Sequence, residues 1–316
     1  MLTKTRTKIP NPKPSQVLVR TMAVSLNPAD AKIVQGNFGC LLGKKTPGFD
    51  FAGIVVEAGS ECKRLKPGDY VYGMTNLFSL GCLAEFVCVE ERVASIKNPS
   101  QSFVQVAALG LVVTTSAQLL GKLCDKRLLV LGGSTCTGMA ALQIAKREQA
   151  KLVVATCSPK NAKLVQSLGA DLVVDYNLDF WKELGEFDLI YDCVGTKNTW
   201  LHADQHLAKH GTFFTLCGDN QDKLSVRSVG ARCAQLVTRN FFEFGRYVAP
   251  FVVESDFRVL DTLNYIDIVI DSVFDFQDYK AGFARLGKAT GKVVVCMPGH
   301  TSLHTSLHAP YKQHVT

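Results

Sequence analysis

The stretch from Leu128 to Gly138 constrains the fold of this 316-residue chain more than any other feature. Leu128-Leu129-Val130-Leu131 is a short apolar run typical of a buried strand, and Gly132-Gly133-Ser134-Thr135-Cys136-Thr137-Gly138 follows it directly, before an amphipathic helical pattern. Where a tight turn joins a strand to a helix, backbone N–H groups and the positive end of the helix face the same point, and a diphosphate binds there. A second apolar strand, Leu152–Thr156, completes the strand–helix–strand unit. We therefore predict that residues 132–138 bind the diphosphate of a dinucleotide.

The residues after this second strand indicate which dinucleotide binds. An acid here would accept hydrogen bonds from the two ribose hydroxyls of NAD, but Thr156–Lys163 contains no acid. A hydroxyl and ammonium groups instead suit the 2′-phosphate of NADP, because a dianion needs donors and positive charge. Ser158 and Lys160 are well placed for this role, whereas Lys163 fits equally well on a solvated helix face. We predict NADPH as the cofactor.

The character of the sequence changes near residue 102. Before it, short β-branched segments separated by glycine indicate an all-β region, with strands at Val17–Val24, Gly53–Ala58, Asp69–Tyr72 and Ala84–Val89. After it, strands alternate with helices, which predicts a parallel sheet with right-handed crossovers and places the chain in the α/β class. We expect helices at 102–121, Gly138–Gln149, Asn161–Ser167 and His202–Lys209, and strands at Arg127–Leu131, Leu152–Thr156, Leu172–Asp175, Asp188–Val194 and Thr212–Cys217. The last pattern, with strands at Ile268–Phe276 and Lys292–Met297 around a helix near Tyr279–Leu286, is interpreted as a return to the first region.

The composition argues against several classes of function. The chain carries 35 basic and 28 acidic residues, and a net charge of +7 falls short of the basic stripes of a nucleic-acid-binding protein. The longest apolar stretch, Val104–Gly121, is interrupted by polar residues and is predicted to be a buried helix, not a membrane span. No signal-peptide pattern opens the chain, so we expect a cytoplasmic protein. A mitochondrial location is the alternative, because the segment before the first acid, Asp30, is basic.

The distribution of cysteine and histidine bears on metal binding. No two of the eleven cysteines have the C-x-x-C spacing, and all seven histidines lie at His202 or later, so the first two-thirds of the chain offers no imidazole to a metal. His202, His206 and His210 recur at a spacing of four on a predicted helix, but no carboxylate or thiol completes the set. We interpret them as a solvated helix face and predict no metal site.

Six short motifs carry a resemblance to a known family. They occur in the order Asn27–Lys32, Pro47–Gly53, Lys66–Asp69, Leu83–Phe86, Ser167–Asp171 and Ala289–Val295. Together they resemble the medium-chain dehydrogenase/reductase superfamily in its zinc-free quinone oxidoreductase branch, and most closely the plant-type enone/alkenal and quinone oxidoreductases. The resemblance implies a GroES-like β-rich catalytic domain (1–117 and 263–316) interrupted by a Rossmann NADPH-binding domain (118–262), commonly in a homodimer.

The same resemblance carries expectations about the reaction. Zinc-dependent members hold their metal with a cysteine and a Gly-His-Glu triplet, whereas this chain has Gly48-Phe49-Asp50, so the imidazole ligand is missing. The resemblance therefore implies zinc-independent hydride transfer from NADPH to a small molecule, either a quinone or an α,β-unsaturated carbonyl such as an enone or alkenal.

The resemblance also suggests site residues. Asn27 and Thr115 are expected near the nicotinamide, and Lys32 is the candidate cation at the enolate oxygen, with a solvent-facing lysine as the alternative interpretation. The apolar walls of the substrate pocket are expected from four phenylalanines that fit ordinary core equally well, namely Phe38, Phe49, Phe241 and Phe242. Further cofactor contacts are expected from Tyr176, Val194, Gly195, Cys217 and Gly218.

Three departures from the family pattern support a second hypothesis. Phe38 stands where enoyl-reductase relatives carry a proton-donating tyrosine, and Thr135 and Cys136 stand where relatives usually have glycine. A positive φ at Thr135 would strain the turn and weaken cofactor binding. The second hypothesis is accordingly a non-enzymatic or weakly active NADPH-binding scaffold protein of the same fold.

Overall fold

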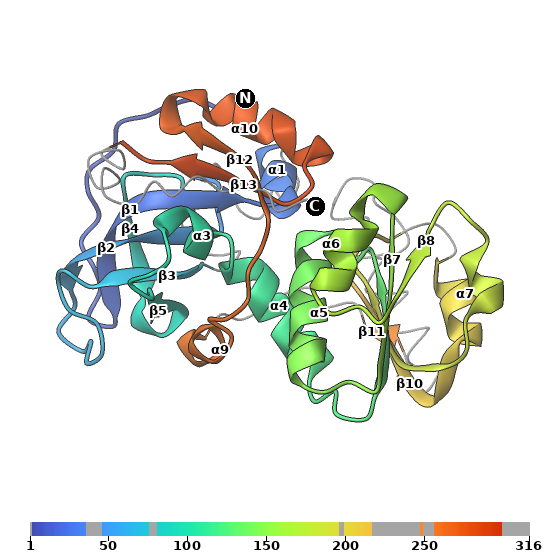
Figure 1. Ribbon diagram of the computed structural model, residues 1–316. Coiled ribbons are helices and arrows are strands. Elements are labelled where there is room, and N and C mark those ends of the chain that lie inside the picture. The colour runs from blue at the N-terminus through green and yellow to red at the C-terminus, as the bar shows by residue number, and fades with distance from the viewer. Residues whose placement is uncertain are drawn as a thin grey trace.

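The computed structural model describes residues 2–35, 46–75, 81–195, 199–216, 247–248 and 256–298. Two lobes lie side by side, each built around one β-sheet, and helix α4 runs between them (Figure 1). Among the described helices, none combines the length and the apolar character needed to cross a lipid bilayer.

The first lobe contains a seven-stranded sheet centred on its longest strand, β1. In spatial order the strands are β12 (Ile270–Asp275), β13 (Lys292–Cys296), β1 (Gln16–Leu26), β2 (Asp50–Ala58), β3 (Tyr70–Met74) and β5 (Ala94–Ile96), and β4 (Phe86–Glu90) also pairs with β1. Strand β2 follows β1 along most of its length, whereas β4 and β13 share the opposite edge of β1. Strands β12 and β13, which come late in the sequence, therefore belong to the sheet of the first lobe.

The second lobe contains a six-stranded sheet in which every pairing is parallel. Its order is β11 (Tyr247–Val248), β10 (Leu207–Thr215), β9 (Phe187–Asp192), β6 (Arg127–Leu131), β7 (Leu152–Cys157) and β8 (Leu172–Asp175). The strand order reverses between β6 and β9, because the chain first adds β7 and β8 on one side of β6 and then crosses to the other side. In a doubly wound sheet, the carboxyl ends of the strands at such a reversal form the ligand site.

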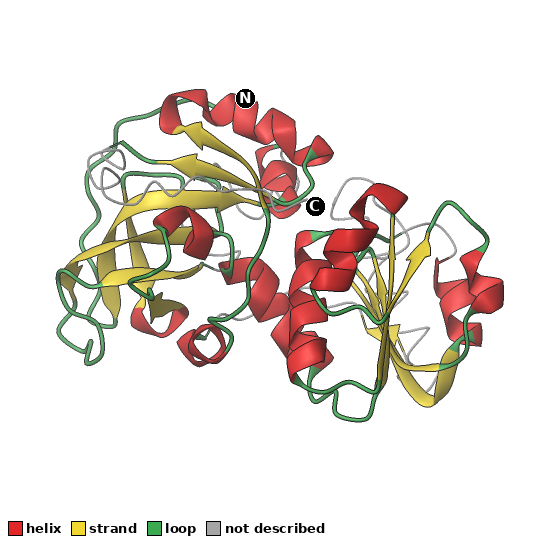
Figure 2. Ribbon diagram, viewed as in Figure 1, coloured by secondary structure: helices red, strands yellow, loops and turns green. Residues whose placement is uncertain are grey.

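The helices cover these two sheets. They are α1 (Pro28–Val34), α3 (Phe103–Ala107), α4 (Gly110–Leu120), α5 (Cys136–Arg147), α6 (Ala162–Ser167), α7 (Thr199–Gln205), α9 (Phe257–Thr262) and α10 (Tyr279–Arg285), with short 3-10 turns at Glu91–Val93, Pro159–Asn161, Phe180–Glu183, Phe276–Asp278 and Leu286–Lys288. In the second lobe, α5 and α6 lie on one face of the sheet and α7 lies on the other (Figure 2). Alternate strand residues pack against the two faces: Leu128 and Val130 belong to the α5 side, and Leu129 and Leu131 to the α7 side.

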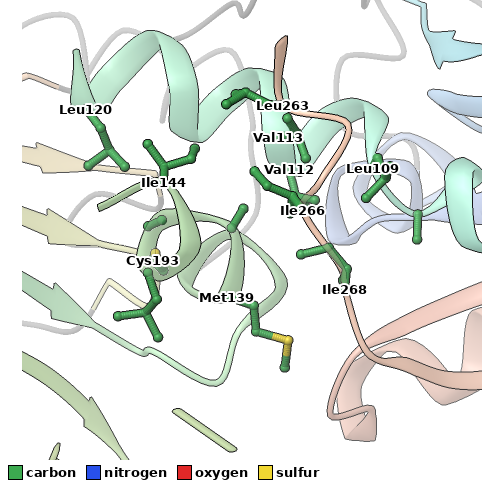
Figure 3. Close-up of a cluster of buried hydrophobic side chains, with 14 of the residues drawn as sticks. Leu109, Val112, Val113, Leu120, Met139, Ile144, Cys193, Leu263, Ile266 and Ile268 are labelled. Atoms are coloured by element: carbon green, nitrogen blue, oxygen red, sulfur yellow. The ribbon is translucent and has the colours of Figure 1, made fainter. Parts of the chain in front are cut away.

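One hydrophobic cluster spans both lobes. The cluster includes Val112 and Val113 of α4 and Leu109, which lies just before this helix. They pack with Met139 of α5 and with Ile266, from the segment that leads back to the first lobe (Figure 3). Each buried aliphatic side chain contributes roughly 1.5–3 kcal/mol relative to an exposed one. This shared core fixes the start of α5, and hence the glycine turn, against the first lobe.

The structure corrects two predicted helices. The helix expected at 102–121 is two helices, because α3 ends at Ala107 and α4 begins at Gly110. The helix expected at His202–Lys209 ends at Gln205, because the chain then joins the sheet as β10, where Leu207 pairs with Phe187. Tertiary strand pairing has overridden a local helical pattern.

The histidine set on that predicted helix is corrected as well. His210 lies in strand β10, so it does not share a helical face with His202 and His206. His202 and His206 instead stack on the Trp181 ring, at centroid distances of 5.7 and 5.3 Å.

Candidate functional site

Two glycines form the turn at the carboxyl end of β6. Gly132 has φ +89°, and a Cβ at this position would lie 2.4 Å from a methyl group of Val194, so any other residue would be both strained and crowded. The Gly132 N–H donates to Thr156 Oγ1 at 3.0 Å, and the Gly133 N–H donates to the Thr156 carbonyl at 2.8 Å. The end of the neighbouring strand β7 thus holds the turn in place.

Thr135 is the N-cap of α5 and has an ordinary backbone, with φ −75° and ψ 158°. Its Oγ1 donates to the Gly132 carbonyl at 2.8 Å and accepts from the Gly138 N–H at 3.0 Å. A Cβ on Gly138 would lie 2.3 Å from the Gly132 carbonyl oxygen, so this glycine permits the helix to pack closely on the turn. The strain considered for Thr135 is absent, and threonine is a favourable N-cap here.

The turn offers free donors where an anion would bind. In the described part of the chain, the backbone amides of Ser134 and Thr137 have no hydrogen-bond partner, and both residues are partly exposed. Helix α5 begins between them at Cys136, and its twelve residues direct the positive end of their dipole to the same point. These features fit a diphosphate, which needs several converging N–H donors.

The end of strand β9 adjoins the turn. Asp192 is buried there, and its Oδ1 accepts from the backbone amides of Val194 (3.0 Å) and Gly195 (2.8 Å) while its Oδ2 accepts from Thr215 Oγ1 at 2.9 Å. Because β9 pairs with β6, this carboxylate places Val194 directly beside Gly132. Sequence reasoning named Val194 and Gly195 but missed Asp192, although an acid that ends the apolar run Leu189–Tyr191 was a usable signal.

The predicted 2′-phosphate residues follow β7 at the same edge of the sheet. Ser158 is half-buried and precedes a short 3-10 turn, whereas the side chains of Lys160 and Lys163 are exposed. Tyr176 is exposed and follows β8, which is one strand farther from the glycine turn. The remaining predicted cofactor residues, Cys217 and Gly218, lie outside the described residues.

Helix α4 links the turn to the first lobe. Thr115, a predicted cofactor residue, is buried on this helix. The neighbouring Ser116 Oγ donates to the carbonyl of Thr137 at 3.1 Å and lies 3.4 Å from the Tyr191 hydroxyl. One serine therefore joins α4 to the first turn of α5 and to β9.

A buried polar network lies in the first lobe around Asn27. Lys292 Nζ donates to Asn27 Oδ1 at 2.6 Å and to Asp50 Oδ2 at 2.8 Å, and Asn27 Nδ2 donates to the same Asp50 oxygen at 2.9 Å. The exposed fraction of these three residues is at most 2 %. Both ends of the Asn27 amide are thus engaged within the protein, so its predicted contact with the nicotinamide stays a prediction.

Asp50 connects this network to helix α4. Its Oδ1 accepts from the Leu111 N–H at 2.7 Å, in the first turn of α4. A Cβ on Gly110 would lie 2.7 Å from that oxygen, so glycine permits the close approach. The Lys292 ammonium group and the amino end of α4 therefore contact the same carboxylate from two sides. In the sequence, Asp50 and Lys292 occur within the family motifs Pro47–Gly53 and Ala289–Val295, and no role was predicted for either residue.

Comparisons with known proteins agree with this architecture. Residues 13–100 match the family described as an alcohol dehydrogenase GroES-like domain, and residues 136–248 match the family described as a zinc-binding dehydrogenase. The chain is 38% identical over 310 residues to the chloroplastic NADPH-dependent alkenal/one oxidoreductase of Arabidopsis thaliana and 35% identical over 310 residues to the 2-methylene-furan-3-one reductase of Solanum lycopersicum; each alignment covers 91% of this chain and 73% of the relative. The chain belongs to the medium-chain dehydrogenase/reductase superfamily.

Solved structures show the same superfamily fold. The quinone oxidoreductase from Coxiella burnetii superposes with a TM-score of 0.74 at 24% sequence identity, over 92% of this chain and 93% of that chain. The quinone oxidoreductase from Pseudomonas syringae superposes with a TM-score of 0.75, also at 24% identity, over 92% and 94% of the two chains. At these identities, the likeness concerns the arrangement of the two lobes.

The other residues suggested by the superfamily resemblance are placed only in part. Lys32 lies half-buried on α1, and Phe49 lies half-buried just before β2. Phe38, Phe241 and Phe242 lie outside the described residues. Among the residues that the structure describes, no group of three or more histidine, cysteine, aspartate or glutamate side chains is placed to hold a metal ion.

Proposed function

We propose that this protein is an NADPH-dependent reductase that transfers hydride, without a metal ion, to a quinone or an α,β-unsaturated carbonyl compound. The observation that carries the proposal is the glycine turn at the strand-order reversal, with the free amides of Ser134 and Thr137 at the start of α5. The names of the relatives, an alkenal/one oxidoreductase and a furanone reductase, support the class of acceptor.

Different residues would bind the different parts of the cofactor. The amides of Ser134 and Thr137 would bind the diphosphate, and Ser158 and Lys160 would bind the 2′-phosphate, because they combine a hydroxyl with a positive charge. Thr115 on α4 would face the nicotinamide side. When bound, NADPH supplies the hydride.

The first lobe would supply the acceptor side of the site. Lys32 is the candidate ammonium group that would stabilise the negative charge developing on the acceptor oxygen. It lies on α1, the helix whose N-cap, Asn27, belongs to the buried network. Phe49 would form part of an apolar wall that excludes water. We further propose a homodimer in the cytoplasm, which light scattering and cell fractionation would test. The domain boundaries that we propose, 117/118 and 262/263, fall within α4 and at the end of α9.

The decisive experiment measures turnover and cofactor choice on purified protein. We expect oxidation of NADPH above background with at least one member of a panel of quinones and alkenals, and calorimetry should show tighter binding of NADPH than of NADH. Absence of binding for both coenzymes would refute the proposal. Turnover by a zinc-loaded preparation that is lost on chelation would refute its metal-free part.

A matched pair of lysine variants tests the NADPH preference. Lys160→Ala removes a charge beyond the carboxyl end of β7, whereas Lys151→Ala removes an exposed charge before its amino end. We expect Lys160→Ala to weaken NADPH binding about tenfold and to leave NADH binding unchanged, while Lys151→Ala changes neither. Equal effects of the two variants would show that Lys160 acts only through the net charge.

A further inference from the structure

The carboxyl group of Asp30 has no part in the function described so far, yet it is fully buried. Its Oδ2 accepts from the Asn27 backbone N–H at 2.9 Å, and its Oδ1 accepts from the Gly48 N–H at 2.8 Å. The Asn27 side-chain Nδ2 lies 3.4 Å from Oδ2. One carboxylate thus holds two backbone segments that are distant in the sequence.

Both segments carry residues assigned to the acceptor side of the site. Asn27 is the N-cap of α1, the helix that bears Lys32. Gly48 has φ +100° and precedes Phe49, and its carbonyl accepts from the Cys82 N–H at 2.8 Å. The direction of α1 and the position of Phe49 therefore both depend on Asp30.

The charged surroundings of Asp30 differ from those of Asp50. Lys292 on β13 bonds directly to Asp50 on β2, whereas the hydrogen bonds to Asp30 within the described residues come from N–H groups of Asn27 and Gly48. Burial, with a smaller repulsion from Asp50, raises the pKa of Asp30 to about 7, although its backbone hydrogen bonds and Lys292 act in the opposite direction. The buried thiol of Cys82 also lies near Asp30, and burial holds the pKa of this thiol far above the neutral range.

We propose that ionised Asp30 is the positioning residue for the acceptor side of the reductase site, because it fixes the start of α1 and the Gly48–Phe49 segment at the same time. This inference rests on the proposed function. A protonated carboxyl group carries a hydrogen on one oxygen, and that hydrogen would meet an N–H group instead of an acceptor. The protonated oxygen accepts more weakly, so the hold on one of the two backbone segments is loosened and turnover falls as the pH is lowered.

The kinetic test compares Asp30→Asn with Asp69→Asn. The asparagine side chain keeps one acceptor oxygen and turns a donor toward the second N–H, whereas Asp69 accepts from the Lys66 N–H in a turn outside the site. With saturating NADPH and the best quinone or alkenal of the panel, we expect wild-type kcat/KM to rise between about pH 6 and about pH 8. Asp30→Asn should lower kcat/KM about tenfold near pH 8 and make kcat/KM nearly independent of pH. Its Kd for NADPH should stay within about twofold of the wild-type value. Asp69→Asn should behave like wild type in all of these measurements.

A second measurement needs neither turnover nor a variant. Labelling with carbonyl-¹³C proline and ¹⁵N glycine selects only the Pro-Gly pairs, and the sequence has three of them, at Gly48, Gly68 and Gly299. The Gly48 amide resonance should shift as Asp30 titrates between about pH 6 and about pH 8. The Gly68 amide, which donates to a backbone carbonyl of Val55, should stay constant.

The outcomes separate this inference from the proposed function. A Gly48 resonance that does not titrate, or Asp30→Asn activity equal to wild type at every pH, would overturn the role of Asp30 even if the reductase activity is real. A wild-type protein that turns over no acceptor would refute the function, while the Gly48 titration would still decide whether Asp30 holds the segment. If Asp30→Asn does not fold, the wild-type titration and pH profile decide the matter.

Discussion

Removal of the Lys292 ammonium group should destabilise the protein far more than removal of an equally close lysine at the surface. Lys292 is 2 % exposed at its side chain, and its partner Asp50 is completely buried, at 2.8 Å. Lys292→Met keeps the length of the side chain but leaves Asp50 charged in the interior and Asn27 Oδ1 without its donor. Loss of one partner of a buried ion pair typically costs 3–5 kcal/mol, a large share of the roughly 5–15 kcal/mol that stabilises a domain.

The assay is urea denaturation followed by circular dichroism, from which the free energy of unfolding is obtained. Lys182→Met is the matched control, because Lys182 and Asp179 form an ion pair at 2.7 Å whose side chains are 81 and 61 % exposed. We expect no measurable change for this control. The double variant Asp50→Asn/Lys292→Met removes both charges, and it should recover more than half of the loss. A cost below about 1 kcal/mol for Lys292→Met would refute the view that burial makes this pair important.

Three further outcomes are expected. The native pKa of Asp30, about 7, exceeds its ordinary value of 3.8, so between these pH values the native state retains a proton that the unfolded state has lost. The free energy of unfolding should therefore fall as the pH rises through this range, by about 4 kcal/mol at most. Urea midpoints measured across this pH range should show the fall in the wild type and lose it in Asp30→Asn. Thr135→Val removes the N-cap oxygen of α5 and should lower the free energy of unfolding by about 1 kcal/mol, as measured by thermal unfolding without cofactor. Gly132→Ala should weaken NADPH binding measured by calorimetry at least tenfold, because its φ is +89° and its Cβ would collide, whereas Gly287→Ala, which has open space around it, should bind NADPH like wild type.

Local patterns predicted the sheets well. The bounds of β6 and β8 agree with the predicted Arg127–Leu131 and Leu172–Asp175, because in each case an apolar run is bounded by turn or polar residues. The glycine turn was predictable for the same reason: its strand, turn and helix are contiguous in the sequence. The helix expected at His202–Lys209 failed because strand pairing with Phe187, a contact between distant segments, decides the structure there.

The buried network could not be predicted in this way. Lys292 and Asp50 are 242 residues apart in the sequence, and Asn27 and Asp50 are 23 apart. No local pattern indicates that these residues meet, although a lysine at the start of the buried strand β13 is itself unusual. The family motifs contain Asp30, Asp50 and Lys292 but do not indicate which residues they contact. Their contacts are visible only in the three-dimensional structure.

Helix α4 connects the buried charges of the first lobe with the glycine turn of the second lobe. The Asp50 carboxylate binds the Leu111 N–H at one end of this eleven-residue helix, and Ser116 farther along binds the Thr137 carbonyl in the first turn of α5. We therefore expect a change at Asp50 to reach the glycine turn through this helix. If this is correct, Lys292→Met should weaken NADPH binding as well as stability, while Ser116→Ala should weaken binding with little effect on the ion pair. Normal NADPH affinity in both variants would show that the two lobes hold their halves of the site independently.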